Sequence, residues 1–218
     1  MKMNRQRAPT SLSRLLVTLI FLVLPGIALA DTDERFSRRG EELFYNSEVT
    51  YPGRSDVGPQ PNDWNQLYYL LSKTPQIRVV VLTSLGGSLG HADKMAATLA
   101  EFDVDTSVNG LCLSSCTHIF LAGRQRILPK GALLGFHRGQ YSAEQIATDV
   151  DRSGAELSPA IAAQMYNAGI EAGLNEVRFL TSHGVSAEFA IKTLSYGPEN
   201  MWFPTVSELL DAGVITDR

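Results

Sequence analysis

The sequence predicts an α/β fold with a mainly parallel sheet covered by helices, and three observations indicate it. The segment IRVVVLTS, residues 77–84, is a short β-branched run bounded by turn residues, which is typical of a strand buried on both faces. A glycine turn and the amphipathic segment LGHADKMAATLAEF follow it. The order of strand, glycine turn and helix then repeats over residues 106–123. Alternation of this kind predicts parallel strands joined by helical crossovers.

The first thirty residues have the features of a secretory signal. They contain basic residues near the start, the apolar run LLVTLIFLVLPGIALA, and small residues at positions 28 and 30. We expect cleavage after Ala30 and a periplasmic or secreted mature protein. An uncleaved membrane anchor is the alternative, but the run is shorter than the roughly 20 residues that span a bilayer, and Pro25 interrupts it.

Composition and charge limit the function classes. The chain has 218 residues, of which 44% are hydrophobic and 19% charged, as in a globular protein with one sizeable core. Loss of the four basic residues in 1–30 would take the formal charge from -4 to -8, which argues against nucleic acid as a partner. Peripheral membrane association stays open. Two cysteines without a nearby Cys/His pair predict no metal site, and no cofactor is implied.

Further elements follow in chain order. Residues 31–60 form a polar leader with a first strand around 43–50, and 61–218 form a single domain. A helix over 64–73 follows Asn62, and a strand over 106–108 passes through Asn109-Gly110 into a helix that begins at 112 and ends at Gly123.

The C-terminal third is predicted to be mostly helical. Two short strands, 124–129 and 132–137, precede it. The expected helices are 159–173, 176–182 and 187–194. Residues 201–216 predict a short strand, a helix capped by Thr205 or Ser207, a stop at Gly213 and a last strand.

Candidate reactive groups follow the predicted strands. In a parallel sheet such groups gather where the strands end. Gly86-Gly87-Ser88 offers backbone N–H groups for an anion. Ser114 or Ser115 would lie in the first turn of a helix, where developing negative charge is favoured, although simple capping is the alternative. His137 ends the apolar strand ALLGFH, where a general base is needed.

These segments resemble the Clp protease proteolytic subunit family and its crotonase-superfamily relatives. SLGGSLGHADKM and NGLCLSSCTHIFLAGRQRILPKGALLGFH are similar to that family's S-P-G-G-S, G-x-A-A-S-M and I-H-Q motifs. The likeness is best over residues 77–137, and FPTVSELLDAGVIT echoes a terminal F-x-S-x-x-E-A-x-x-x-G-L-I-D pattern. The resemblance implies ClpP/crotonase-like repeated ββα units, peptide or protein substrates, and a homo-oligomer.

The resemblance assigns roles residue by residue. Ser114 matches the nucleophile and His137 the general base, while the N–H groups of Gly87 and Ser115 match the oxyanion donors. The family's third member is an aspartate, and Asn200 is the nearest match to it. An asparagine can orient the imidazole but cannot stabilise the imidazolium by charge.

Several departures leave alternatives open. Leu85 replaces the family's proline, and Glu199 is the next match after Asn200 for the third residue. One of the acidic residues in the polar segment 144–151 could supply the missing carboxylate. Related signal-peptide peptidases use a Ser-Lys dyad, for which Lys94 or Lys130 are candidates. His118 is more typical of a core histidine than of a base.

The two cysteines flank Ser114 at i-2 and i+2. Cys112 and Cys116, four apart on a helix, would have Cα atoms near the roughly 4.4 to 6.8 Å that a disulfide requires. In an oxidising compartment we expect a disulfide rather than free thiols. It would stiffen the turn around Ser114 while closing too short a loop to stabilise the fold much.

Together these observations predict an exported serine endopeptidase-like hydrolase. A non-catalytic ClpP-like binding protein with a degenerate site is the alternative, because a fold does not imply a function. Acyl-CoA chemistry of the crotonase kind is disfavoured, since an exported protein rarely meets coenzyme A.

Overall fold

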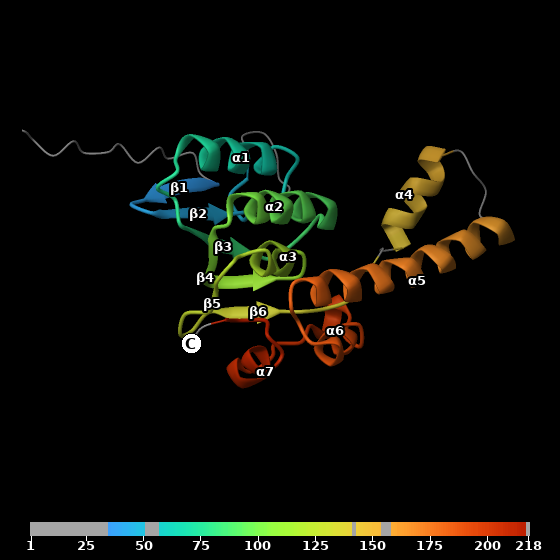
Figure 1. The fold of residues 1–218 in the computed structure, drawn as a ribbon. Coiled ribbons are helices and arrows are strands. Elements are labelled where there is room, and N and C mark those ends of the chain that lie inside the picture. The colour runs from blue at the N-terminus through green and yellow to red at the C-terminus, as the bar shows by residue number, and fades with distance from the viewer. Residues whose placement is uncertain (1–34, 51–56, 141–142, 154–157, 217–218) are drawn as a thin grey trace, which may run out of the picture.

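A six-stranded, mostly parallel sheet organises the chain (Figure 1). The computed structural model describes residues 35–50, 57–140, 143–153 and 158–216, so the predicted signal segment and its cleavage site lie outside the described residues. Strand order is β1-β2-β3-β4-β5, with β6 also on β4, and helices flank the sheet. The predicted α/β fold is confirmed.

An antiparallel hairpin forms one edge of the sheet. β1 (Phe36–Arg39) pairs with β2 (Glu42–Asn46), and β2 runs parallel to β3 (Val79–Ser84). Only the second of the two hairpin strands was predicted. β1 could not be predicted from the sequence, because FSRR lacks the apolar pattern of a strand and only its Phe36 is buried.

β3 is the buried central strand that its sequence predicts. Val80 and Leu82 are fully buried, as in a strand covered on both faces. The predicted helices are confirmed as α1 (Asp63–Lys73) and α2 (Leu89–Phe102), which pack against one another. Their apolar faces supply core residues, among them Leu67, Leu71, Met95 and Leu99.

The strand β4 (Asp105–Leu113) is longer than predicted. Its register with β3 jumps from Leu82↔Val108 to Ser84↔Cys112, so the residues between form a bulge inside the strand. The predicted turn at Asn109-Gly110 is this bulge, and α3 (Cys116–Leu121) begins four residues later than expected. Ser114 consequently lies between strand and helix rather than inside the helix.

Two short strands pair in succession along the free edge of β4. β5 (Arg126–Ile127) pairs with its first half, and β6 (Leu133–Gly135) with its second half. Leu113 lies opposite Gly135, and an isolated bridge joins Phe136 to Trp202. The end of β6 therefore lies beside the junction of β4 and α3.

The C-terminal part is mostly helical, as predicted, but differs from the prediction in several places. The polar segment 144–151 is helical, and the strand expected at the start of 201–216 is a single bridge at Trp202. The elements are α4 (Ala143–Ser153), α5 (Pro159–Ser182), α6 (Ala187–Thr193), a 3-10 turn (Pro198–Asn200) and α7 (Val206–Asp211). α5 is one continuous helix that extends beyond the sheet (Figure 1), and residues 214–216 form no strand. Thr205 caps α7 as predicted. Within the described ranges, every helix is too short or too polar to span a bilayer.

Candidate functional site

Three strand ends bring the predicted site residues to one edge of the sheet. Gly86 and Gly87 follow β3, Ser114 follows β4, and His137 lies two positions after the end of β6. β3 and β6 each pair in parallel with β4, so the carboxyl ends of the three strands lie at the same edge. Neighbouring strands lie about 4.8 Å apart, which makes this edge a suitable place to assemble a site.

Ser114 occupies a strained turn between strand and helix. Its φ of 54° is left-handed, a conformation that costs about 1 to 3 kcal/mol for a residue other than glycine. Its N–H donates to Gly135 O at 2.9 Å, and its carbonyl accepts from the N–H and hydroxyl of Thr117. A serine held in such a strand-to-helix turn is typical of nucleophiles whose hydroxyl must be exposed.

Gly86 lies directly against the side chain of Ser114. A Cβ atom on Gly86 would lie 2.6 Å from Ser114 Cβ and 2.7 Å from Leu113 O, and the φ of Gly86 is +92°. Only glycine allows both this conformation and this approach. The turn after β3 is thereby fixed next to the hydroxyl of Ser114.

Two backbone N–H groups near this hydroxyl have no hydrogen-bond partner among the described residues. Leu85 N–H donates to Glu48 Oε1, and Gly86 N–H donates to Ser84 Oγ. In the described part of the chain, the N–H groups of Gly87 and Ser115 make no hydrogen bond. In addition, α2 begins two residues after Gly87, so the positive end of its helix dipole lies close to this turn. The arrangement can therefore stabilise an oxyanion.

The two serines differ in access. Ser115 Oγ is buried and has no hydrogen-bond partner within the described residues. Ser114 is only half-buried. A nucleophile has to reach its substrate, so the geometry favours Ser114 over Ser115.

A disulfide spans the Ser114 turn, as predicted. Cys112 and Cys116 are fully buried and bonded, with Cα atoms 5.2 Å apart. The bridge does not lie within one helix, since Cys112 belongs to β4 and Cys116 opens α3. It ties the end of the strand to the start of the helix on either side of Ser114.

The ring of His137 is oriented by a backbone carbonyl. Its Nδ1 lies 2.7 Å from Arg138 O, and because a carbonyl only accepts, Nδ1 carries the proton in the neutral ring. Nε2 is then the free acceptor, which is the tautomer that a general base needs. Among the described residues, no hydrogen bond joins His137 to Ser114.

The predicted contact of Asn200 with His137 is not formed. Asn200 Oδ1 accepts from Gly197 N–H at 2.6 Å inside its own 3-10 turn, and the side chain is exposed. No hydrogen bond joins it to His137 in the described structure. Arg138 O takes the place expected for Asn200, and nothing in the local sequence signals a backbone group in that role.

The alternative lysines do not hydrogen-bond to Ser114. Lys94 Nζ lies over the ring of Trp64, 5.2 Å from its centroid. Lys130 lines an apolar surface groove with Leu128 and Leu210. Of the acidic segment, Asp151 is an exposed residue of α4. A Ser-Lys dyad receives no support from these contacts.

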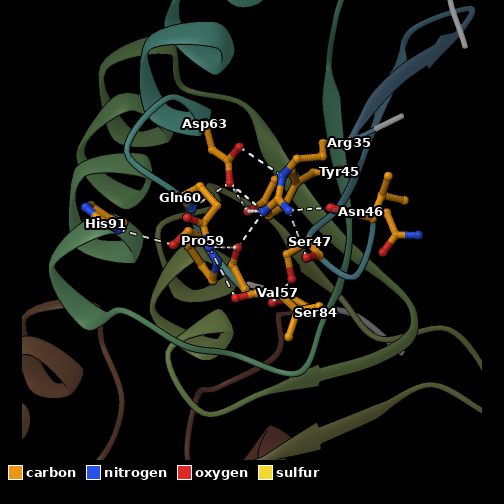
Figure 2. A network of polar contacts seen from close by, with 12 residues as sticks. Arg35, Tyr45, Asn46, Ser47, Val57, Pro59, Gln60, Asp63, Ser84 and His91 are labelled. Carbon is orange, nitrogen blue, oxygen red and sulfur yellow. Dashed lines mark hydrogen bonds and ion pairs between the residues drawn. The ribbon is translucent and has the colours of Figure 1, made fainter. Parts of the chain in front are cut away.

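A buried ion pair behind the glycine turn was missed from the sequence (Figure 2). Arg35 is bidentate to Asp63, with contacts of 3.0 and 2.7 Å, and Tyr45 OH donates to the same carboxylate at 2.7 Å. Burial by itself lowers the pKa of Arg35, but the interactions with Asp63 and Tyr45 together outweigh it and the pKa is raised. Burial and then Asp63 raise the pKa of Tyr45.

This ion pair braces the turn through Gly58. Arg35 also donates to the carbonyls of Ser47 and Gly58. A Cβ atom on Gly58 would lie 3.2 Å from Gly87 Cα, so the two backbones are in direct contact. Arg35 lies in a stretch predicted to be a leader, so no sequence signal pairs it with Asp63.

A buried histidine joins three helices. His118 Nδ1 lies 2.7 Å from Asp93 and its Nε2 3.0 Å from Glu176, while Phe179 stacks on the ring at 3.9 Å. Burial opposes the charged form, but the hydrogen bonds to Asp93 and Glu176 and the charges of these two carboxylates together outweigh it and raise the pKa of His118 to about 9. His118 therefore ties α3 to α2 and α5 as an imidazolium.

The described residues contain no cluster of three or more histidine, cysteine or acidic side chains that could hold a metal ion. The chemistry available at this edge is that of a hydroxyl, an imidazole and two amide donors.

Comparison with known proteins supports the fold. No model of a known protein family matches the chain, and no curated protein matches it. Among solved structures, a mutant of ClpP1 from Listeria monocytogenes is similar over 73% of this chain and 85% of that chain, with a TM-score of 0.52 and 16% identity. Similarity at this level shows a ClpP-like fold.

Proposed function

We propose that this chain is an exported serine hydrolase that acts on peptide bonds. Ser114 attacks the carbonyl, and Nε2 of His137 takes its proton and returns it to the leaving amine. The N–H groups of Gly87 and Ser115 stabilise the oxyanion of the tetrahedral intermediate. Arg138 O holds the ring tautomer but adds no full negative charge, so we expect a slower enzyme than one with an aspartate.

One observation carries this proposal: two backbone N–H groups without a partner in the described structure lie close to a serine in a left-handed turn. Backbone strain and unpaired donors are both unfavourable in a folded chain. The strained serine and the unpaired donors lie at the same edge of the sheet as His137. Their combination is explained if they act together on a substrate carbonyl.

A fluorophosphonate probe tests the proposal. We expect covalent labelling of the wild-type protein that is lost in Ser114→Ala. The matched control is Ser115→Ala, which removes a buried hydroxyl and should keep the labelling. Labelling that survives Ser114→Ala would contradict the assigned nucleophile.

A non-catalytic binding protein is the second candidate. The missing hydrogen bond between Ser114 and His137 and the turned-away Asn200 favour it. It predicts no fluorophosphonate labelling under any condition, together with retained binding of unstructured peptides by the Ser114→Ala variant.

A homo-oligomer is part of the proposal and is supported by α5. Only Leu180 of its 24 residues is buried, and several of its exposed side chains are apolar: Met165, Tyr166, Ile170 and Leu174. Light scattering after size exclusion should give a multiple of the chain mass. Tyr166→Glu with Ile170→Glu should lower that mass, while Gln164→Glu, at an exposed polar position, should not.

Export completes the proposal. The basic start, the apolar run and the small residues at 28 and 30 support cleavage after Ala30, and the disulfide fits an oxidising compartment. Amino-terminal sequencing of the exported protein should begin at Asp31. A chain that begins at Met1 and stays in the membrane fraction would contradict cleavage.

A further inference from the structure

A chain of hydrogen bonds leads from the glycine turn to the carboxylate of Glu48. Gly86 N–H donates to Ser84 Oγ at 3.1 Å, Ser84 Oγ lies 2.6 Å from Ser47 Oγ, and Ser47 Oγ lies 2.9 Å from Glu48 Oε1. Figure 2 shows the two serine side chains side by side. β2 and β3 bring them together, since Asn46 pairs with Thr83 in the parallel register.

The proton positions in this chain follow from its end group. A carboxylate only accepts and each hydroxyl has one proton, so Ser47 donates to Glu48 and Ser84 donates to Ser47. All links then point in one direction, an arrangement in which each bond strengthens the next. Ser47 and Ser84 are fully buried, so water does not compete for these bonds.

Glu48 also binds the backbone of Leu85, the residue before Gly86, directly. Leu85 N–H donates to the same Oε1 at 2.9 Å. Of three consecutive N–H groups, those of Leu85 and Gly86 are therefore bonded to Glu48, directly or through the serines. The N–H of Gly87 makes no hydrogen bond to any described residue. The φ of Gly87 is +143°, a conformation that glycine adopts without a strong intrinsic preference. The direction of its N–H then depends on the peptides that precede it.

We propose that Glu48 is a positioning residue that aims the Gly87 N–H at the reacting carbonyl, an inference that rests on the proposed hydrolase. It does not touch substrate in this scheme and acts through Leu85 and Gly86. Misdirection of an oxyanion donor weakens binding of the transition state more than binding of the ground state. The rate of the covalent step should fall while binding of the probe is kept.

The experiment measures inactivation of the full chain by a fluorophosphonate probe, separated into the maximal rate kinact and the half-saturating concentration KI. In Glu48→Ala we expect kinact to fall about tenfold, below the 10² to 10³ loss typical of deleting a donor, with KI within twofold. Glu48→Gln keeps an Oε1 acceptor and should recover kinact to within about threefold. Glu42→Gln, at the exposed start of the same strand, is the matched control and should match wild type.

Hydrogen exchange of the amides in 84–88 gives a readout independent of activity. Glu48→Ala should accelerate their exchange, and Glu42→Gln should not. If Glu48→Ala fails to fold, Ser84→Ala breaks the same chain of bonds and should give the same pattern. Unchanged kinact, or a Glu48→Gln variant as slow as Glu48→Ala, would overturn the positioning role. A wild-type protein that is never labelled would instead refute the hydrolase, and unchanged exchange would still refute the role of Glu48.

Discussion

The two sides of the candidate site differ in how firmly they are held. On the donor side, Gly86 is packed against Ser114, its N–H is bonded to Ser84, and a disulfide ties the strand to the helix around Ser114. On the base side, the imidazole of His137 makes one hydrogen bond within the described residues, to the carbonyl of its own neighbour. The backbone around the base is anchored, but the ring is not packed into a network.

This difference indicates that the donor groups, more than the imidazole, are fixed in the folded protein before substrate binds. Oxyanion donors act best when they are fixed before the reaction, because no reorganisation is then needed as charge develops. A general base can tighten its contacts when substrate binds, and its hydrogen bonds are often long in ligand-free enzymes. The donor side should therefore be sensitive to small structural changes, and the base side mainly to loss of the imidazole.

Loss of the imidazole should give the largest effect on the rate. In His137→Ala we expect the fluorophosphonate inactivation rate to fall about 10³-fold, within the 10² to 10⁴ typical of general base catalysis. The folded structure should be unchanged, since His137 is half-buried and the backbone on either side of it is held, at Phe136 by Trp202 and at Arg138 by Tyr196. His183→Ala is a suitable control. A rate within threefold of wild type would remove His137 from the site.

A single methyl group on the donor side should be nearly as damaging. Gly86→Ala places Cβ in contact with Ser114 and Leu113, and we expect inactivation to fall about 10²-fold, as for loss of an oxyanion donor. Gly110→Ala is the matched control, because its φ of +81° imposes similar strain but its Cβ would meet nothing within 4 Å. Equal losses in both variants would mean that strain alone, rather than contact with Ser114, explains the effect.

The sequence predicts the donor side well because its signals are local. A β-branched run, paired glycines and an amphipathic helical segment locate Gly86 and Gly87 at the end of β3 without tertiary information. The junction at Ser114 was less predictable, since the bulge at Asn109-Gly110 depends on pairing with β3. The position of the serine relative to the helix therefore needed the sheet register.

Stability should depend on pH through the histidine that connects the donor-side helices. His118 has a pKa of about 9 in the folded protein against about 6.5 unfolded, so its stabilisation is full below pH 6.5 and is lost as the pH rises to 9. The difference corresponds to about 3 kcal/mol. Urea unfolding at pH 6 and pH 9.5 should reveal this decrease in the free energy of unfolding.

Two variants separate His118 from other titrating groups. His118→Gln should be less stable at pH 6 and should show a weaker decrease toward pH 9.5. His91→Gln, which replaces a histidine outside this cluster, should keep the wild-type dependence. A wild-type decrease that persists in full in His118→Gln would contradict the assignment.

Removal of the disulfide should weaken the donor side without abolishing it. The loop between Cys112 and Cys116 is short, and the loop-entropy relation gives about 2 kcal/mol of stability for a loop of this size. In the Cys112→Ser, Cys116→Ser double variant we expect about tenfold slower inactivation, because Ser114 is freer to leave its left-handed conformation. Inactivation at the wild-type rate would show that Thr117 and Gly135 alone hold the turn.

The base side exposes the limit of sequence reasoning. A motif match aligned Asn200 with a catalytic aspartate, but a chain position near the right motif does not fix where a side chain points. Asn200 closes its own turn by accepting from Gly197, an interaction between residues three apart that competes with any long-range contact. The group that does orient the ring, Arg138 O, belongs to the backbone, and every residue type could supply it.

The smallest expected effect follows from this competition. Asn200→Asp restores the carboxylate of the resembled family at that position, yet its oxygen should remain on Gly197 N–H, so inactivation should stay within twofold of wild type. Glu199→Gln, next to it and also exposed, serves as the control. A rate increase of tenfold or more in Asn200→Asp would mean that the side chain does reach His137. The imidazole would then be held by a side chain as well as by Arg138 O, and the base side would be as firmly fixed as the donor side.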